Sequence, residues 1–263
     1  MQRHERFGQF FLPAVNARVY LAWCHAALGM FPEGTALGDE GLRIAEAVAH
    51  PGSLMWAYHG IGLLSLRQGD LSRALPLLER AIDLGQDASL PLWVPGIAAA
   101  LGAASALAGR AVDALRLLER AVEQDVLHGI PVVRLGEAYL LAGRLEDAHT
   151  LAEQALALAR THQERGHEAY ALCLLGDIAA HRDLPDVAQA EAHYQQALAL
   201  AEELGMRPLQ AHCHRGLGTL YAATGQREQA RMALSTAIAL YRDMEMTFWL
   251  PQTEAALAQV EGR

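Results

Sequence analysis

The chain has 263 residues, of which 52% are hydrophobic, and its formal net charge is −9. It contains 50 Ala, 43 Leu and no Lys, so all 21 of its basic residues are Arg, and the abundance of these two helix formers predicts an all-helical protein. A P-loop, a protein-kinase site and a Schiff-base site each require a Lys side chain, which excludes all three on this chain alone.

The chain is predicted to begin with a lead-in segment, residues 1–14. Its apolar Phe7, Phe10, Phe11 and Leu12 run directly into a repeat array over residues 15–246. The segment contains no apolar signal core followed by a cleavage site. It also has no polar cap for the first repeat, so we expect it to continue from a longer chain.

An internal repeat dominates the rest of the sequence. Each copy has Leu or Ile before a Gly, a small or aromatic residue three positions after that Gly, a second Gly seven positions after the first, and Ala five positions further on. Four clear copies contain Gly62, Gly102, Gly136 and Gly218, and two weaker copies lie near Ala22 and Gly176. The turn positions are 29, 69, 109, 143, 183 and 225. One of the steps between them is 34 residues, the period of the tetratricopeptide repeat.

The apolar spacing predicts two amphipathic helices per unit, with the turn Gly ending the first helix in a left-handed conformation. A single helix pair cannot bury its apolar stripe, so the units are expected to stack into a right-handed superhelical solenoid of about six tetratricopeptide-like pairs. A compact bundle, the alternative, would not need Gly at the same phase in every unit. The units are predicted near residues 15–50, 55–88, 95–128, 129–162, 169–204 and 211–244.

Residues 247–263 are predicted to form a capping helix and tail. Terminal units of such an array expose an apolar face. Leu250, Ala256 and Leu257 are placed to cover the face of the last repeat.

The sequence contains no convincing catalytic or metal-binding motif. His212 and His214 are two residues apart, so on a helix they point about 200° apart and cannot share a metal ion. Glu146 and His149 have the spacing of one arm of a di-iron site, but no matching second pair occurs. G-x-S-x-G is absent, and no predicted strand precedes a dinucleotide-binding glycine motif. We therefore predict a non-enzyme without catalytic residues, metal or cofactor.

The remaining candidate is the groove lined by the first helix of each unit. It is largely apolar over its first two-thirds, and it lacks the Lys/Asn set with which some such domains clamp a peptide carboxylate. A hydrophobic helix or a neighbouring domain is therefore the expected partner, rather than an acidic tail. Tight winding that buries these residues inside the superhelix is the alternative. The predicted groove residues are Trp23, Trp56, His59, Leu63, Arg67, Glu137, Tyr170, Asp177, His181, His212, Arg215 and Thr219.

Three C-terminal stretches, AEELGMRPL (201–209), HCHRGLGTLY (212–221) and YRDMEMTFWL (241–250), resemble a known family region. They are similar to the C-terminal tetratricopeptide region of large bacterial signalling proteins, in which an adenylate/guanylate cyclase domain precedes a STAND/AAA-type ATPase domain. Weaker similarity extends to HPGSLMWAYHGIGLL and DASLPLWVP. The resemblance implies a scaffolding or regulatory arm that binds a protein or peptide partner, or its own upstream ATPase or cyclase domain. It leaves open a solenoid that senses a small-molecule inducer.

The location and the remaining partners are predicted from charge and cysteine content. Acidic residues outnumber Arg and no basic stripe occurs, so direct binding to nucleic acid is not expected. The most apolar run, residues 97–108, is shorter than the roughly 20 residues of a membrane span. Cys24, Cys173 and Cys213 are odd in number and far apart in sequence, which favours a reducing cytoplasm.

Overall fold

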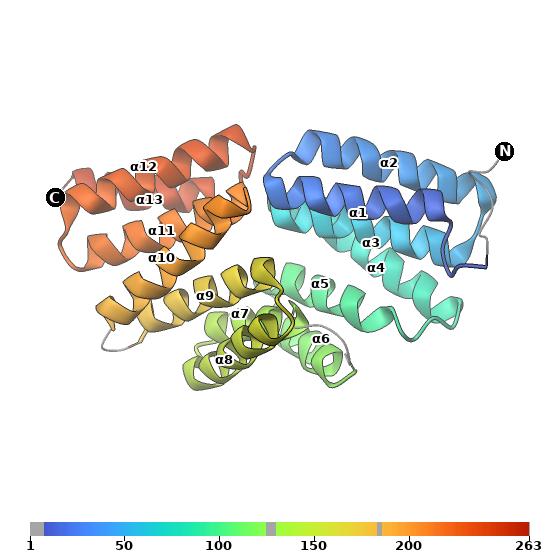
Figure 1. The fold of residues 1–263 in the computed structure, drawn as a ribbon, viewed down its shortest axis with the longest axis horizontal. Coiled ribbons are helices and arrows are strands. Elements are labelled where there is room, and N and C mark those ends of the chain that lie inside the picture. Colours follow the sequence, from blue (N-terminus) through green and yellow to red (C-terminus); the bar gives the residue numbers. More distant parts are fainter. Residues whose placement is uncertain (1–7, 125–129, 183–185, 263) are drawn as a thin grey trace. The chain divides into compact units, whose positions relative to one another are not determined.

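The computed structural model describes residues 8–124, 130–182 and 186–262, and these residues form helices without any strand (Figure 1). The predicted all-helical solenoid class is confirmed. None of the described helices combines the length and apolar character needed to cross a bilayer. In chain order the helices are α1 Pro13–Leu28, α2 Phe31–Val48, α3 Pro51–Gln68, α4 Leu71–Asp87, α5 Val94–Leu107, α6 Ala111–Gln124, α7 Ile130–Leu141, α8 Leu145–Thr161, α9 Arg165–Ala180, α10 Val187–Glu203, α11 Arg207–Ala223, α12 Arg227–Asp243 and α13 Leu250–Glu261.

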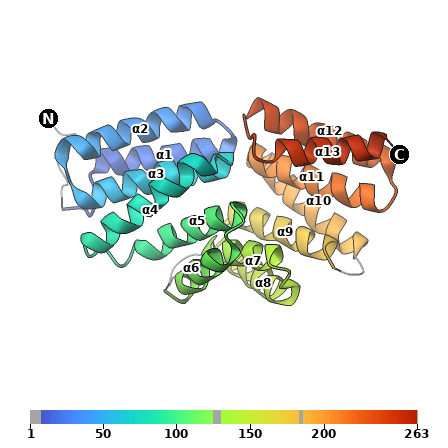
Figure 2. The ribbon, with the colours of Figure 1, turned by 180° about the vertical axis from the view of Figure 1, so that it is seen from behind.

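The chain divides into two compact units, residues 1–126 and 127–263, which are called unit 1 and unit 2 here. In each unit the helices pair in sequence, α1 with α2 through α5 with α6, and α7 with α8 through α11 with α12 (Figure 2). Within a unit, successive first helices also contact each other, as α1 does α3 and α9 does α11. Comparable contacts between successive second helices are not found among the described residues. The first helices therefore form the more closely packed layer of each unit.

The turn within each pair has the predicted left-handed glycine. Gly69 has φ 86°, its N–H donates to the Leu66 carbonyl at 3.1 Å, and the Asp70 N–H donates to the Ser65 carbonyl at 2.9 Å. These bonds satisfy two of the last carbonyls of α3, as a left-handed glycine at a helix end allows. Positive φ is confirmed at turn positions 29, 69, 109, 143 and 225, while position 183 lies outside the described residues.

In four turns that follow the second helix of a pair, a residue other than glycine has a left-handed backbone conformation, which the repeat pattern did not predict. Ala49, Ser89, Gln163 and Glu245 have φ between 52° and 57° without being glycine. A non-glycine residue in this region carries a modest conformational cost. The neighbouring backbone offsets it, because the N–H of the residue after Ser89 donates to the Gly85 carbonyl at 2.9 Å.

The glycine inside the first helix allows the two helices of a pair to approach closely. A Cβ placed on Gly62 would lie 2.8 Å from Leu78, and one on Gly218 would lie 2.6 Å from Leu234. Both leucines are fully buried and come sixteen residues after their glycine. The close approach expected from the sequence is therefore confirmed, and it explains the fixed phase of this glycine in the repeat.

The last helix, α13, packs against α12 and α11. Val260 is buried in a small cluster with Ala230 and Leu234, and Ala256 and Leu257 pack against that cluster. The side chain of Arg227 donates to the Val260 carbonyl at 2.9 Å, which joins the start of α12 to the end of α13.

Candidate functional site

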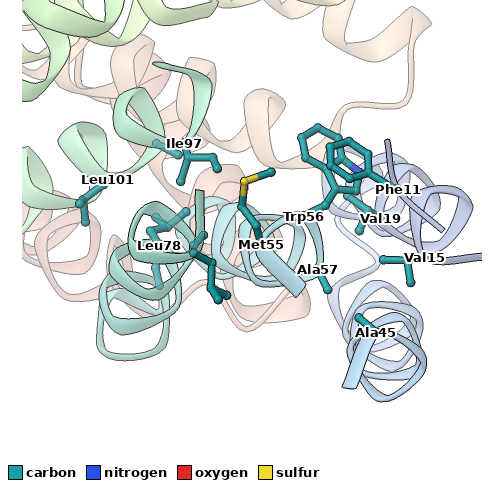
Figure 3. Close-up of a cluster of buried hydrophobic side chains, with 14 of the residues drawn as sticks. Phe11, Val15, Val19, Ala45, Met55, Trp56, Ala57, Leu78, Ile97 and Leu101 are labelled. Atoms are coloured by element: carbon teal, nitrogen blue, oxygen red, sulfur yellow. The ribbon is translucent and has the colours of Figure 1, made fainter. Parts of the chain in front are cut away.

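Unit 1 contains a group of aromatic side chains that is called the aromatic cluster here. It consists of Phe10, Phe11, Tyr20, Trp23, Trp56, Trp93 and the ring of His59. Phe11 stacks on Trp56 with ring centroids 4.9 Å apart and planes 6° apart (Figure 3). Trp23 and Trp93 each meet Trp56 edge-on at 5.2 Å. These are the arrangements that aromatic quadrupoles favour, so the rings support one another.

Hydrogen bonds fix the positions of the two central indoles. Trp56 Nε1 donates to Asn16 Oδ1 at 2.9 Å, and Trp23 Nε1 donates to the Gly60 carbonyl at 3.2 Å. The segment before α1 is also anchored, because the Leu12 N–H donates to Ser53 Oγ at 2.9 Å. Each indole N–H therefore has the partner that a buried ring requires.

The exposed part of the aromatic cluster differs from the part that the sequence suggested. Trp56 is 5% exposed and His59 is 7% exposed, so both belong to the core of unit 1. Phe10 and Tyr20, by contrast, are 66% and 49% exposed, and each has its ring against a tryptophan of the cluster. The most exposed rings of the aromatic cluster are thus Phe10 and Tyr20, neither of which was a predicted groove residue.

The predicted groove residues of unit 1 lie within the aromatic cluster or pack beside it. Trp23 and Leu63 are half-buried and pack against the core of the unit. Arg67 is half-buried, and its Nη1 donates to the Trp23 carbonyl at 3.1 Å. Burial lowers the pKa of His59 to about 4, so this ring is neutral at neutral pH. Its buried Nδ1 has no hydrogen-bond partner within the described residues.

In unit 2 the first helices α7, α9 and α11 carry a second group of side chains, called the polar face here. It consists of Arg134, Glu137, Tyr170, Asp177, His212 and Arg215. Arg134 and Glu137 form an ion pair at 3.0 Å. Their charges also act on side chains of neighbouring helices. Glu137 raises the pKa of Asp177 on α9, and Arg134 lowers the pKa of His212 on α11. The structure thus brings five predicted groove residues of unit 2 near Arg134, which was not predicted.

Asp177 is held by a tyrosine that reaches over from the second helix of its own pair. The Tyr194 hydroxyl donates to Asp177 Oδ1 at 2.6 Å, and Tyr194 is only 1% exposed. Tyr194 fits there because it lies against Gly176 and Gly216, where a Cβ would come within 3 Å of its ring. Burial raises the pKa of Asp177, while Arg215 and the Tyr194 hydrogen bond act in the opposite direction.

A tyrosine holds His212 in a similar way in the next helix pair, α11 and α12. Its Nδ1 lies 2.7 Å from the Tyr241 hydroxyl, and its ring meets Trp249 edge-on at 4.7 Å. Burial, together with the charges of Arg215 and Arg134, lowers the pKa of His212 to about 3. The imidazole is therefore neutral at neutral pH and contributes no positive charge to the polar face.

Two observations concern the metal-ligating and nucleophilic side chains of unit 2. Within the described residues no three His, Cys, Asp or Glu side chains are grouped so that they could hold a metal ion. Cys173 and Cys213 are buried within hydrogen-bond reach of each other, and this contact together with burial raises the pKa of the Cys173 thiol, which disfavours the nucleophilic thiolate. Two further predicted groove residues, His181 just after α9 and Thr219 within α11, are exposed.

Two predicted groove residues owe their positions to tyrosines that the sequence analysis missed. Tyr194, in the middle of the second helix α10, holds Asp177, and Tyr241, near the end of the second helix α12, holds His212. A signal was present for Tyr194, because it stands where most other units have the buried Leu that faces the helix glycine. A hydroxyl at that position must find a polar partner on the first helix.

Comparison with known proteins agrees with the repeat architecture. Tetratricopeptide-repeat models match residues 105–173 and 168–243, which together make up more than half of the chain. No curated protein matches the chain. Among solved structures, BtubC (BKLC) from P. vanneervenii has a TM-score of 0.53 and 20% identity, covering 88% of this chain and 92% of its own.

Two further solved structures have lower similarity. One contains the nearly identical TPR-like repeats described as a kinesin light chain of Podosopora anserina, with 20% identity, a TM-score of 0.47 and coverage of 76% and 96%. The other is the TPR2AB domain of yeast Sti1 with pHSP90, with 11% identity, a TM-score of 0.39 and coverage of 94% and 98%. The helix pairs, their turn glycines and the two matching models identify the chain as a member of the tetratricopeptide-repeat family.

Proposed function

We propose that the chain is a non-catalytic interaction module that binds an apolar segment of a protein partner on the aromatic cluster of unit 1. The observation that carries this proposal is the exposure of Phe10 and Tyr20, whose rings meet tryptophans of the cluster edge-on. Phe10 lies against Trp93, and Tyr20 lies against Trp23 and Trp56, which are both held by hydrogen bonds. Helical-repeat proteins generally bind partners on such extended surfaces. Aromatic side chains that are already fixed lose little conformational freedom on binding, so they serve well as anchors.

The chemistry of the aromatic cluster favours an apolar partner over an acidic one. Arg67, the predicted groove cation of this unit, is half-buried and donates to a backbone carbonyl. His59 is buried and neutral. A partner helix with a stripe of apolar side chains would bury the rings of Phe10 and Tyr20 without needing a counter-charge.

We further propose that the chain is the regulatory arm of a bacterial signalling protein of the cyclase or STAND/AAA ATPase type, and that the partner is the upstream ATPase domain. The support is the resemblance carried by residues 201–209, 212–221 and 241–250. Any nucleotide chemistry would then belong to that upstream domain, because this chain has no Lys with which to build a P-loop.

The test begins with the reading frame upstream of Met1, which is expected to encode an ATPase or cyclase domain. That domain is purified separately and titrated calorimetrically with the repeat chain. Replacing Phe10 and Tyr20 together with Ala is expected to weaken binding by about tenfold or more, as loss of aromatic anchors does.

The matched control replaces Val112 and Met232, which are 72% and 64% exposed and lie outside the aromatic cluster. This variant is expected to bind like the wild type. Equal affinities for all three proteins would overturn the assignment to the aromatic cluster. A reading frame without either domain would contradict the proposed parent protein while leaving the cluster to be tested on whatever domain is encoded there.

A further inference from the structure

The helix α1 has an exposed apolar stripe, which is called the α1 stripe here. It consists of Ala17, Leu21, Cys24 and Leu28, whose spacing of four, three and four residues places them on one face of the helix. All four are exposed, Leu21 to 49% and Leu28 to 38%. A helix with so few polar residues around its circumference is usually buried, so this face lacks the cover that such a helix normally has.

The same positions are buried in later first helices of both units. Leu21 is the repeat residue that precedes the helix glycine, a position at which the first copy has Ala22. Its counterparts, between 1% and 8% exposed, are Ile61, Leu101, Leu175 and Leu217. The counterparts of Cys24, at most 3% exposed, are Leu64, Ala104, Ile178 and Leu220. Exposure at these positions is therefore a property of α1 and not of the repeat.

In the later first helices these positions are covered by the second helix that comes before. The helix α2 packs against α3, and α4 against α5, α8 against α9 and α10 against α11 in the same way. A Cβ on Gly34 of α2 would lie 2.7 Å from Leu64 Cδ1, and one on Gly38 would lie 2.8 Å from Ile61 Cγ1. Small residues four apart on α2 thus leave room for the large side chains of α3.

The chemistry of the α1 stripe indicates which kind of helix would cover it. The stripe itself contains no charged side chain, and the neighbouring Arg18 is already paired with Glu40 at 2.6 Å. An apolar partner face therefore fits without a counter-charge. A second copy of the chain would bring its own Leu21 and Leu28 to this face. The packing of α2 on α3 favours small residues opposite the leucines, and hence a helix of a different sequence.

We propose that the α1 stripe binds an amphipathic helix of a partner protein, in which Gly or Ala recurs four residues apart on the apolar face. This helix lies along α1 as α2 lies along α3, and Leu21 packs beside its small residues as Ile61 packs beside Gly38. The α1 stripe does not include Phe10 or Tyr20, so the inference does not rest on the proposed function.

The test uses a peptide with the sequence of α2, residues 31–48, as a probe that already has this spacing of glycines. Lys and Glu replace Arg43 and Ala47, which are exposed on α2, and are joined as a lactam to hold the peptide helical. Binding to the whole chain is followed by fluorescence anisotropy of the labelled peptide. A second peptide with Gly34→Leu and Gly38→Leu is measured in parallel and is expected to bind about tenfold more weakly or less, because its leucines would clash with Leu21.

The location of the bound peptide is read from Cys24. This cysteine is exposed, whereas Cys173 and Cys213 are buried, so Cys24 is expected to react first with N-ethylmaleimide. Mass spectrometry of tryptic fragments follows its modification. We expect the reaction to be slowed about tenfold or more by a saturating concentration of the α2 peptide, and to be unaffected by the leucine-substituted peptide at the same concentration.

Variants of the chain test the α1 stripe directly. Leu21→Asp should weaken peptide binding by about tenfold or more, because the new carboxylate would be buried without a partner. Ala17→Arg, at a position that is already exposed, places a long side chain in the path of the peptide and should have the same effect. The matched control is Val112→Asp on α6, at a side chain that is 72% exposed. Both this control and Phe10→Ala should bind like the wild type.

Circular dichroism melting shows whether each variant is folded, and Ala17→Arg supplies the comparison if Leu21→Asp is not. Four results would overturn the proposal: no saturable binding at millimolar peptide, binding that leaves the Cys24 reaction unchanged, equal affinity of the two peptides, or unchanged affinity in the folded stripe variants. A dimer of the chain alone in sedimentation equilibrium that Leu21→Asp dissociates would make a second copy the occupant, and would also overturn it. A loss in Phe10→Ala equal to that in Leu21→Asp would instead assign the peptide to the aromatic cluster.

Discussion

Phe11 lies parallel to Trp56 at a centroid distance of 4.9 Å, although forty-five residues separate them in the chain. Phe11 also meets Trp93 edge-on at 4.9 Å, so the segment before α1 is built into the core of unit 1. Phe11 covers Trp56, so the most exposed rings of the aromatic cluster are those of Phe10 and Tyr20.

Replacing Phe11 with Ala should therefore destabilise unit 1. The side chain is 5% exposed, and deletion of a buried phenylalanine costs about 3–5 kcal/mol of unfolding free energy. The matched control is Phe10→Ala, one residue away but 66% exposed, for which a change of within about 0.5 kcal/mol is expected. Urea denaturation monitored by tryptophan fluorescence measures both. Similar losses for the two variants would contradict the stacking role of Phe11.

The close approach of α11 and α12 predicts a severe effect of one methyl group. Gly218→Ala would place Cβ 2.6 Å from Leu234 Cγ, and overpacking of this kind costs about 1–3 kcal/mol. Gly96 on α5 has no atom within 4 Å of a new Cβ, so Gly96→Ala should be neutral or stabilising, since Ala is the better helix former. In thermal melts, Gly218→Ala should lower the midpoint temperature, and Gly96→Ala should leave it unchanged or raise it.

A double variant tests the stated cause. Leu234→Ala removes the side-chain atoms at 2.6 and 2.8 Å and leaves only the backbone nitrogen of residue 234 at 3.0 Å. Gly218→Ala should therefore cost less in a Leu234→Ala background than in the wild type. Additive losses in this cycle would mean that another contact is responsible.

Stability should fall with acid in a way that depends on His59. The folded-state pKa of about 4 lies below the ordinary value of 6.5, so the unfolded state binds the proton more readily. The stability contributed by the neutral ring is therefore complete above pH 6.5 and is lost progressively as the pH falls towards 4. Between pH 7.5 and 5 this amounts to about 2 kcal/mol.

The measurement compares wild type and His59→Phe by urea unfolding at the two pH values. The variant keeps a ring between Trp23 and Trp56 but has no group to protonate. It should lose less stability than the wild type on acidification, because only the other titrating groups remain. Parallel losses in both proteins would show that His59 does not set the acid response.

The hydrogen bond between Tyr194 and Asp177 predicts a coupled change in stability and titration. Tyr194→Phe leaves the partly buried carboxyl group without its donor, which should cost about 1–3 kcal/mol. Because that hydrogen bond favours the ionised form, its loss should raise the pKa of Asp177 further. Carbon NMR of the Asp177 carboxyl group measures the pKa. An unchanged titration would contradict the 2.6 Å contact as a determinant of that pKa.

Much of the fold is local and could be read from the sequence. The helix pairs, the left-handed turns at Gly69 and its equivalents, and the glycine that faces Leu78 all follow from the spacing of residues within one repeat. The turns at Ala49 and Ser89 were missed, because neither residue favours positive φ. In these turns the packing of adjacent helix pairs sets the backbone dihedrals, against the intrinsic φ preference of Ala49 and Ser89.

The repeat, its phase and the set of first-helix residues from which a binding surface can be built follow from the sequence, because helical periodicity assigns each residue to a face. Which of these residues are exposed depends on contacts between helices and segments that lie far apart in the chain. Phe11 comes from outside the repeat and covers Trp56, and Tyr194 reaches across from α10 to hold Asp177. Such contacts depend on the distance between two helices or segments in space and on the length of the side chain that spans it. The spacing of residues along the sequence carries no information about that distance.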